Sequence, residues 1–321
     1  MKSSFNGILG FAIGDAMGVP LEFVQRQKLI NDPVTEMLGY GSHNVPKGTW
    51  SDDTSMTLAT IDSIINTGKI DYTDIASNFL KWFKDAKYTA TDKVFDIGRT
   101  TLHALANIEQ SMSNATDCGE KSEYSNGNGS LMRILPIAYY CYKQSQNNKM
   151  SNEKVLEIVS GVSSITHAHE ISILGCYIYT MYAIRLLNGD NKYNSYEHIK
   201  NLDYSKFSKD SLSRYDRILK DDISKLDINE IKSSGYIVDT LEATLWVLLN
   251  TSNYNQAIIG AINLGNDTDT IGACTGGLAG IIYGEDTINS NWKNSLLKKE
   301  YIQDLCEKFD DKLNNFKGDN V

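Results

Sequence analysis

The sequence lacks the features that mark β-rich proteins. Only four prolines occur in 321 residues, and three of them precede residue 50. No series of short alternating segments with hairpin turns is present. Apolar residues instead recur at helical spacing, as in Ile75, Phe79 and Trp82. The C-terminal segment repeats this pattern with Leu305 and Phe309 on one stripe. The sequence therefore predicts an all-α protein.

Cysteine is also scarce and irregularly placed. The five cysteines stand at positions 118, 141, 176, 274 and 306, without a CxxC pair. An odd number without close spacing argues against a disulfide framework and against a zinc cage. We therefore expect a reducing, cytoplasmic setting.

Clusters of positive charge and long membrane-spanning runs are missing as well. The formal net charge is −9, and no cluster of lysine and arginine stands out, so we expect no nucleic-acid partner. The apolar run near the N-terminus is interrupted by Asp15 and four glycines, which argues against a signal peptide. The most apolar later segment, residues 171–187, contains Arg185 and three tyrosines and is slightly short for a membrane span. We expect a buried core helix there and no membrane partner.

The chain is long enough for a substantial core, with 41% hydrophobic residues. We expect one domain over residues 1–321, with a polar surface excursion of short helices at about 188–234. Residues 109–130 form a segment rich in Ser, Asn and Gly that predicts a long loop. Loops of that length in compact domains are often functional.

Two acidic clusters are the most informative local features. The first is "GTWSDDTSM" at residues 48–56, and the second is "GNDTDTIG" at residues 265–272. Each has an ordinary interpretation as a helix N-cap, with Ser51 or Asp52 capping one helix and Asp269 or Thr270 the other. Because small residues follow both clusters, the two helix ends can approach each other closely inside a bundle.

The donor atoms of the two clusters suggest a metal site. Four aspartates with neighbouring hydroxyl groups offer only oxygen ligands, which suit Mg²⁺ or Mn²⁺ better than zinc. Four carboxylates exceed what one Mg²⁺ normally takes from protein, whereas two ions would balance them. The clusters therefore predict a pair of divalent ions.

Three further segments are weaker signals. Glu22 follows a glycine-lined helix in "GDAMGVPLEF", where it is either solvated, as lone glutamates usually are, or directed into a site. "SNGNGSLMR" resembles an anion cradle, with Ser130 capping a helix, although such Asn-Gly pairs are often plain turns. In that segment Arg133 either adds charge to the cradle or forms an ordinary ion pair. His167 and His169 are two residues apart and would not share a helix face.

These segments together resemble the ADP-ribosylglycohydrolase family. The motifs "GDAMGVPLEF", "GTWSDDTSM", "NGNGSLMR", "THAH", "GYIVDTLEATLW" and "LGNDTDTIGACTGGLAG" occur in the family's order, from residue 7 to about 284. The chain is most similar to the bacterial branch, typified by the dinitrogenase reductase-activating glycohydrolase. The resemblance implies an all-α orthogonal bundle with a dinuclear Mg²⁺ or Mn²⁺ site in a central cleft. It also implies removal of ADP-ribose from a modified protein side chain.

The resemblance also implies roles for particular residues. It implies that the metal ligands are Ser51, Asp52, Asp53, Asp267, Asp269 and Thr270. It implies that the catalytic residues are Glu22, Asp53 and Asp96, the last because "FDIGRTTLHAL" resembles a segment of the arginine-directed branch. It implies that ADP-ribose is bound by Asn126, Gly127, Asn128, Gly129, Ser130, Met132, His167 and Tyr236.

Two features depart from the family pattern, and two other functions stay open. Ser51 stands where many members have threonine, and residues 188–234 follow no family pattern.

The first alternative function is a metal-dependent phosphohydrolase that cuts the pyrophosphate of an ADP-ribose-like nucleotide. The second is an inactive relative that binds ADP-ribose. A further interpretation of Asp96 is that it caps a helix beginning near Ile97 or pairs within that helix.

Overall fold

The chain folds as a bundle of helices. The computed structural model describes residues 3–110, 114–147 and 150–315. Within these ranges there is no β-strand, and the only extended pairings are three isolated bridges. The prediction of an all-α protein is confirmed. One cluster of buried apolar side chains extends from Ile8 in the first helix to Leu313 in the last.

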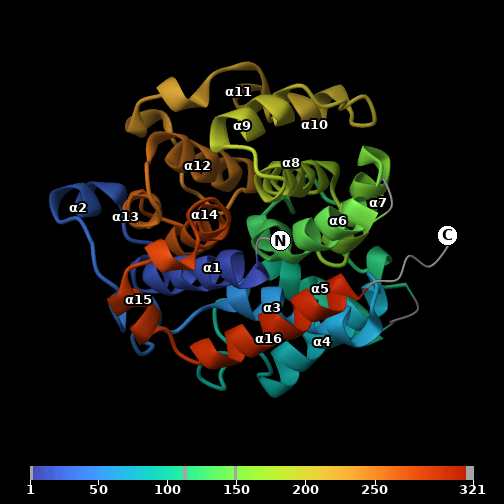
Figure 1. The fold of residues 1–321 in the computed structure, drawn as a ribbon, viewed down its shortest axis with the longest axis horizontal. Helices are drawn as coiled ribbons and strands as arrows, with labels where there is room; N and C mark the ends of the chain where they lie inside the picture. Colours follow the sequence, from blue (N-terminus) through green and yellow to red (C-terminus); the bar gives the residue numbers. More distant parts are fainter. Residues whose placement is uncertain (1–2, 111–113, 148–149, 316–321) are drawn as a thin grey trace.

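Sixteen α-helices make up the described part of the chain (Figure 1). Their bounds are α1 Ser4–Gly18, α2 Arg26–Asn31, α3 Asp52–Thr67, α4 Tyr72–Asp85, α5 Arg99–Gln110, α6 Leu135–Asn147, α7 Asn152–Ser164, α8 Glu170–Leu187, α9 Lys192–Lys200, α10 Lys209–Ser213, α11 Asp216–Lys220, α12 Ile237–Asn250, α13 Tyr254–Ile262, α14 Thr268–Tyr283, α15 Ser290–Ser295 and α16 Lys299–Asn314. Seven short 3₁₀-helices connect them, including η1 Val19–Leu21, η2 Gly41–His43 and η4 Asn128–Arg133.

Helices α1 and α14 pack against each other at the centre of the bundle (Figure 1). Glycines line the contact, and a Cβ atom built on Gly14 would lie 2.0 Å from the carbonyl oxygen of Gly272. Only glycine permits backbones to approach this closely. At the end of the contact, the Thr268 hydroxyl donates to the carbonyl oxygen of Gly18 at 2.7 Å. The segment that carries Glu22 is thereby held beside the second acidic cluster.

Helix α1 also fixes the position of the first acidic cluster. The buried carboxylate of Asp15 accepts hydrogen bonds from the backbone N–H of Ser51 at 2.9 Å and of Thr54 at 3.1 Å. It also accepts one from the Thr54 hydroxyl at 2.6 Å. Ser51 itself is the N-cap of α3, since its hydroxyl accepts from the N–H of Asp53 at 3.2 Å. Because α1 contacts both clusters, it brings together residues that lie about two hundred positions apart in the sequence.

Several predicted helix ends are wrong by a few residues. Helix α14 begins at Thr268 after Asp267, with no side-chain cap, so Asp269 and Thr270 lie within its first turn. Ser130 lies inside η4 and caps no α-helix, because α6 begins only at Leu135. Asp96 adopts a left-handed backbone conformation (φ 57°) three residues before α5 begins. Among the described residues, no backbone N–H of α5 donates a hydrogen bond to its side chain, so a capping role is not supported.

The two remaining composition-based predictions concern α8 and the cysteines. Helix α8 is long and apolar enough to cross a membrane by length and composition alone, but 83% of that stretch is buried inside the protein. It is therefore the core helix that the sequence predicted. All five cysteines are buried. Residues 188–234 contain α9, α10, α11 and two 3₁₀-helices.

Candidate active site

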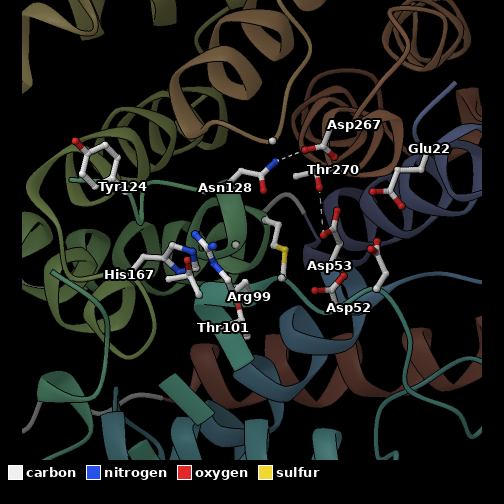
Figure 2. A pocket seen from close by; sticks show the side chains of 17 residues that line it. Glu22, Asp52, Asp53, Arg99, Thr101, Tyr124, Asn128, His167, Asp267 and Thr270 are labelled. Carbon is white, nitrogen blue, oxygen red and sulfur yellow. Dashed lines mark hydrogen bonds between the residues drawn. The ribbon is translucent and has the colours of Figure 1, made fainter. Parts of the chain in front are cut away.

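A cavity of about 480 Å³ opens where the two acidic clusters meet (Figure 2). This volume lies in the usual range for small-molecule sites. The cavity is lined by many of the predicted site residues, namely Glu22, Asp52, Asp53, Asp96, Gly127, Asn128, Gly129, Met132, His167, Asp267 and Thr270. Figure 2 shows Glu22 and Asp52 toward one end of the cavity, and His167 and Tyr124 toward the other.

The acidic end joins side chains from three parts of the chain. Carboxylate oxygens of Glu22, Asp267 and Asp269 lie within 4.8 Å of one another. The hydroxyl of Thr270 donates to Oδ1 of Asp53 at 3.5 Å, which links the second cluster to the first (Figure 2). These contacts gather oxygen donors from the η1 turn, from α3 and from the start of α14 at one point.

The electrostatics of this end call for a cation. Burial, followed by repulsion from neighbouring carboxylates, raises the pKa of Asp52, Asp53 and Asp269 well above the usual range. Burial also raises the pKa of Asp267, against a hydrogen bond from Asn128. Among the described residues no lysine, arginine or histidine forms an ion pair with any of these four aspartates.

Unpartnered buried oxygens test whether a metal would fit. Oδ2 of Asp53 and Oδ1 of Asp269 are buried and accept no hydrogen bond from any described residue. A buried carboxylate oxygen without a partner is costly. A divalent cation with a preference for oxygen ligands would satisfy both atoms and favour the ionised carboxylates. The residues present therefore fit Mg²⁺ or Mn²⁺.

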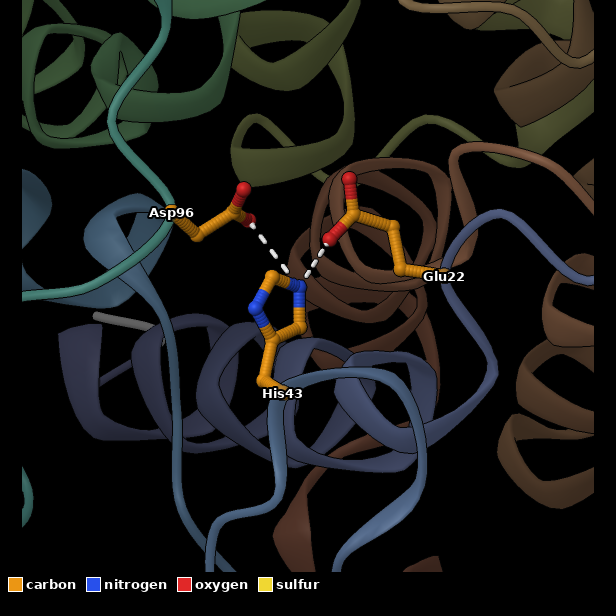
Figure 3. A group of neighbouring side chains, drawn as sticks. All are labelled: Glu22, His43 and Asp96. Atoms are coloured by element: carbon orange, nitrogen blue, oxygen red, sulfur yellow. Dashed lines mark hydrogen bonds and ion pairs between the residues drawn. The ribbon is translucent and has the colours of Figure 1, made fainter.

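A histidine that the sequence did not single out joins the acidic end (Figure 3). Nε2 of His43 hydrogen-bonds with Oε2 of Glu22 and lies 4.0 Å from Oδ2 of Asp96. Burial raises the pKa of Glu22 to about 7, while the bond to Glu22 raises the pKa of His43. His43 belongs to η2, in a segment where Tyr40 and Asn44 have positive φ angles. No spacing rule links this segment to Glu22, so only the tertiary structure reveals the contact.

The other end of the cavity is formed by the Asn-Gly segment. The side-chain amide of Asn128 donates to Oδ2 of Asp267 at 2.7 Å and to the Thr240 hydroxyl at 2.9 Å, so this segment also contacts the acidic end. The ring of His167 packs against Gly129, where an added Cβ atom would lie 2.8 Å from Cε1 of the ring. Glycine is therefore required at position 129 for the histidine to reach the cavity.

Sequence reasoning missed several cavity residues in addition to His43. The start of α5 contributes Gly98, Arg99, Thr100 and Thr101, and the exposed Tyr124 stands at the rim (Figure 2). Arg99 is the only lysine or arginine among the described lining residues. The motif "FDIGRTTLHAL" pointed to Asp96 but carried no signal for the neighbouring Arg99.

Five predicted site residues do not line the cavity, namely Ser51, Asp269, Asn126, Ser130 and Tyr236. Ser51 caps α3, and Asp269 is buried within the acidic end behind the cavity lining. The Asn126 amide binds the backbone carbonyl of Glu123 and the Ser172 hydroxyl, so it holds the loop in place. The Ser130 hydroxyl accepts from the thiol of Cys176 in the core. Tyr236 pairs through its backbone with Gly127, while its neighbour Gly235 lines the cavity.

Comparison with known proteins identifies the family. The family profile described as ADP-ribosylglycohydrolase matches residues 4–317, nearly the whole chain. The chain belongs to the ADP-ribosylglycohydrolase family. The family predicted from the motifs is thereby confirmed.

Individual relatives agree with this assignment. The ADP-ribosylarginine hydrolase Tri1 of Serratia proteamaculans is 32% identical over 302 residues, covering 94% of this chain and 76% of the relative. The ADP-ribosyl-[dinitrogen reductase] glycohydrolase of Rhodospirillum rubrum is 29% identical, covering 91% of this chain and 90% of the relative. A solved structure, titled ADP-ribosylglycohydrolase-related protein complex, superimposes with a TM-score of 0.80 at 25% identity and covers 97% of both chains.

Proposed function

We propose that this ADP-ribosylglycohydrolase family member is a metal-dependent hydrolase that removes mono-ADP-ribose from a modified protein side chain, preferentially arginine. One observation carries the proposal: two buried acidic clusters meet at one end of a cavity whose other end presents the Asn-Gly segment and His167. The products are ADP-ribose and the unmodified side chain. We also propose that residues 1–321 form one domain, since a single apolar cluster spans the described residues.

The acidic end is proposed to hold two Mg²⁺ or Mn²⁺ ions. The ligands are Ser51, Asp52, Asp53, Asp267, Asp269 and Thr270, with the unpartnered oxygens of Asp53 and Asp269 as the strongest support. When bound, such ions polarise sugar hydroxyls and lower the pKa of a coordinated water. None of the four aspartates has an ion-pair partner among the described residues, which also keeps this end of the cavity attractive to the ions before substrate arrives.

Glu22 is proposed to act as the general base, with Asp53 as a second carboxylate near the reacting carbon. A base is most effective when its pKa is close to the working pH, and burial brings the pKa of Glu22 to about 7. Its bond to His43 fixes the orientation of the carboxylate toward the cavity. As the glycosidic bond breaks, the sugar acquires oxocarbenium-like positive charge, which the surrounding carboxylates stabilise.

Asp96 is proposed to receive the leaving guanidine of an arginine adduct. Its carboxylate lines the cavity near Glu22 and is half-buried. Paired hydrogen bonds between a guanidinium and a carboxylate are strong and directional, so this residue would favour arginine over serine. The Serratia relative, which is named an ADP-ribosylarginine hydrolase, supports the same preference.

Matched peptides test the proposal. The protein is incubated with Mg²⁺ and peptides ADP-ribosylated on arginine or on serine, and the products are identified by mass spectrometry. We expect intact ADP-ribose, released faster from the arginine peptide, and Asp96→Ala should remove most of that preference. Release of AMP would support pyrophosphate cleavage instead, and faster release from the serine peptide would contradict the role of Asp96.

A further inference from the structure

Arg133 is a fully buried cation without a carboxylate partner. It neither lines the cavity nor forms an ion pair with a described residue, so neither role suggested by the sequence applies. Its guanidinium stacks on the ring of Phe79 at 4.7 Å. One nitrogen, Nη2, donates to the carbonyl oxygen of Val162 at 3.1 Å and to the hydroxyl of Thr166 at 2.7 Å. Keeping an arginine buried in this way is costly, which points to a purpose for its contacts.

The hydroxyl of Thr166 connects Arg133 to the cavity. Its Oγ1 lies 2.8 Å from Nδ1 of His167, and both residues are buried. A guanidinium can only donate, so Thr166 accepts from Arg133. The hydroxyl hydrogen of Thr166 then needs an acceptor, and among the described residues its only other hydrogen-bond partner is Nδ1 of His167. If Nδ1 carried the proton instead, that hydroxyl hydrogen would be buried without a partner, which is unfavourable.

We propose that Arg133 and Thr166 are positioning residues that fix His167 as the tautomer with its proton on Nε2. The Nε2–H group then faces the cavity as a permanent hydrogen-bond donor. It recognises an acceptor oxygen of the bound nucleotide, a phosphate or ribose oxygen of ADP-ribose. The identity of this ligand rests on the proposed function, whereas the tautomer does not.

The surroundings of His167 hold the ring in this state. Burial, followed by the positive charge of Arg133, lowers the pKa of His167 to about 3, against a small opposing effect of Glu120, so the ring stays neutral at neutral pH. The backbone is pinned on both sides, since Glu120 donates to Thr166 and accepts from Ala168. The close contact with Gly129 limits ring movement. Arg133 also polarises the Thr166 hydroxyl and so strengthens its bond to Nδ1.

The tautomer can be read directly from nitrogen-15 NMR of the full chain labelled at its five histidines. The signals of His167 are assigned by their loss in His167→Gln. We expect the shifts of a neutral ring protonated at Nε2, unchanged between pH 5.5 and 8. A ring protonated at Nδ1, or a ring that titrates with an ordinary pKa in this range, would overturn the proposal without reference to any ligand.

The hydrogen bonds from Arg133 to Thr166 and from Thr166 to His167 form a relay. Affinity for ADP-ribose, measured by calorimetry with Mg²⁺, tests whether this relay supports binding. Thr166→Val keeps the shape but removes the hydroxyl, and we expect affinity to fall about tenfold, the scale of one hydrogen bond. Thr166→Ser should retain affinity within about twofold. Thr180→Val is the matched control, because the buried Thr180 hydroxyl in α8 has no described partner.

The outcomes separate this inference from the proposed function. Unchanged affinity in Thr166→Val, or an equal loss in Thr180→Val, would overturn the role of the relay in binding. If the wild type showed the Nε2–H tautomer but bound no ADP-ribose, the positioning of His167 would stand and the proposed function would be contradicted.

Discussion

The metal-free protein should lose stability as the pH rises, contrary to the usual effect of ionised carboxylates. Burial raises the pKa of Asp15 from 3.8 to about 7, despite its hydrogen bonds from Thr54 and Ser51. The folded state therefore favours the neutral carboxyl, whereas the unfolded chain ionises near pH 4. The resulting stabilisation is complete below about pH 4 and is lost as the pH rises through 7.

The expected size of this effect follows from the pKa. One pKa unit corresponds to about 1.4 kcal/mol, so Asp15 alone should cost about 4 kcal/mol over the whole titration, of which about 3 kcal/mol is lost between pH 4 and 7. The pKa values of Asp52, Asp53 and Asp269 are raised as well, so these residues act in the same direction. A total stability of about 5–15 kcal/mol makes such a change easy to measure. Bound Mg²⁺ should offset the loss, because it favours the ionised carboxylates.

Urea unfolding followed by circular dichroism, with EDTA or Mg²⁺ at pH 5, 6, 7 and 8, measures both effects. Asp53→Asn is the informative variant, because one of its two carboxylate oxygens is buried without a partner. With EDTA at pH 8 this variant should be more stable than the wild type, but Mg²⁺ should stabilise it less. Metal-free stability that rises from pH 5 to 7, or an Asp53→Asn variant that is destabilised with EDTA at pH 8, would refute this reasoning.

Substitutions at three positions test the site and the helix packing that supports it. Glu22→Gln should lower turnover by roughly 10²–10⁴-fold while ADP-ribose affinity measured by calorimetry is retained, and a collapse of affinity at normal turnover would make Glu22 a binding residue. His43→Phe should reduce turnover at least ~10-fold, because Glu22 loses its hydrogen-bond partner. The separate variant His43→Gln, which can still form that bond, should retain most of the wild-type turnover. Equal activity of the two variants would exclude this positioning role. Gly14→Ala should lower the free energy of unfolding, measured by chemical denaturation, by at least roughly 1–3 kcal/mol, because its Cβ would clash with the carbonyl oxygen of Gly272. Gly260→Ala is the control, because a Cβ atom there would make only ordinary contacts.

The sequence was most informative where one short motif carries the chemistry. "SDDT" and "NDTDT" each place carboxylates and a hydroxyl within four or five residues, so the acidic donors could be named without a structure. The apolar spacing of Ile75, Phe79 and Trp82 likewise predicts α4, which buries all three. Local patterns of this kind depend on helix geometry, which the sequence encodes directly.

The sequence was least informative where a contact depends on the tertiary fold. His43 meets Glu22 only because η2 packs against η1, and Arg99 reaches the cavity only because α5 begins there. Ser130 was predicted to cap a helix beginning there because serine is a common N-cap residue, yet the chain forms a 3₁₀-helix and α6 begins later. Arg133 was predicted either to add charge to the anion cradle or to form an ordinary ion pair, and nothing local shows that it is buried behind Thr166 and His167.

The central claim is that the two acidic clusters form one site for divalent metal. Equilibrium dialysis against Mn²⁺, followed by metal analysis, measures this directly for the wild type and for one variant from each cluster, Asp52→Ala and Asp269→Ala. We expect two ions per wild-type chain, fewer in both variants, and a loss of turnover of at least ~100-fold in each. A wild type that binds no Mn²⁺, or a variant that keeps both ions and near-normal turnover, would contradict the claim.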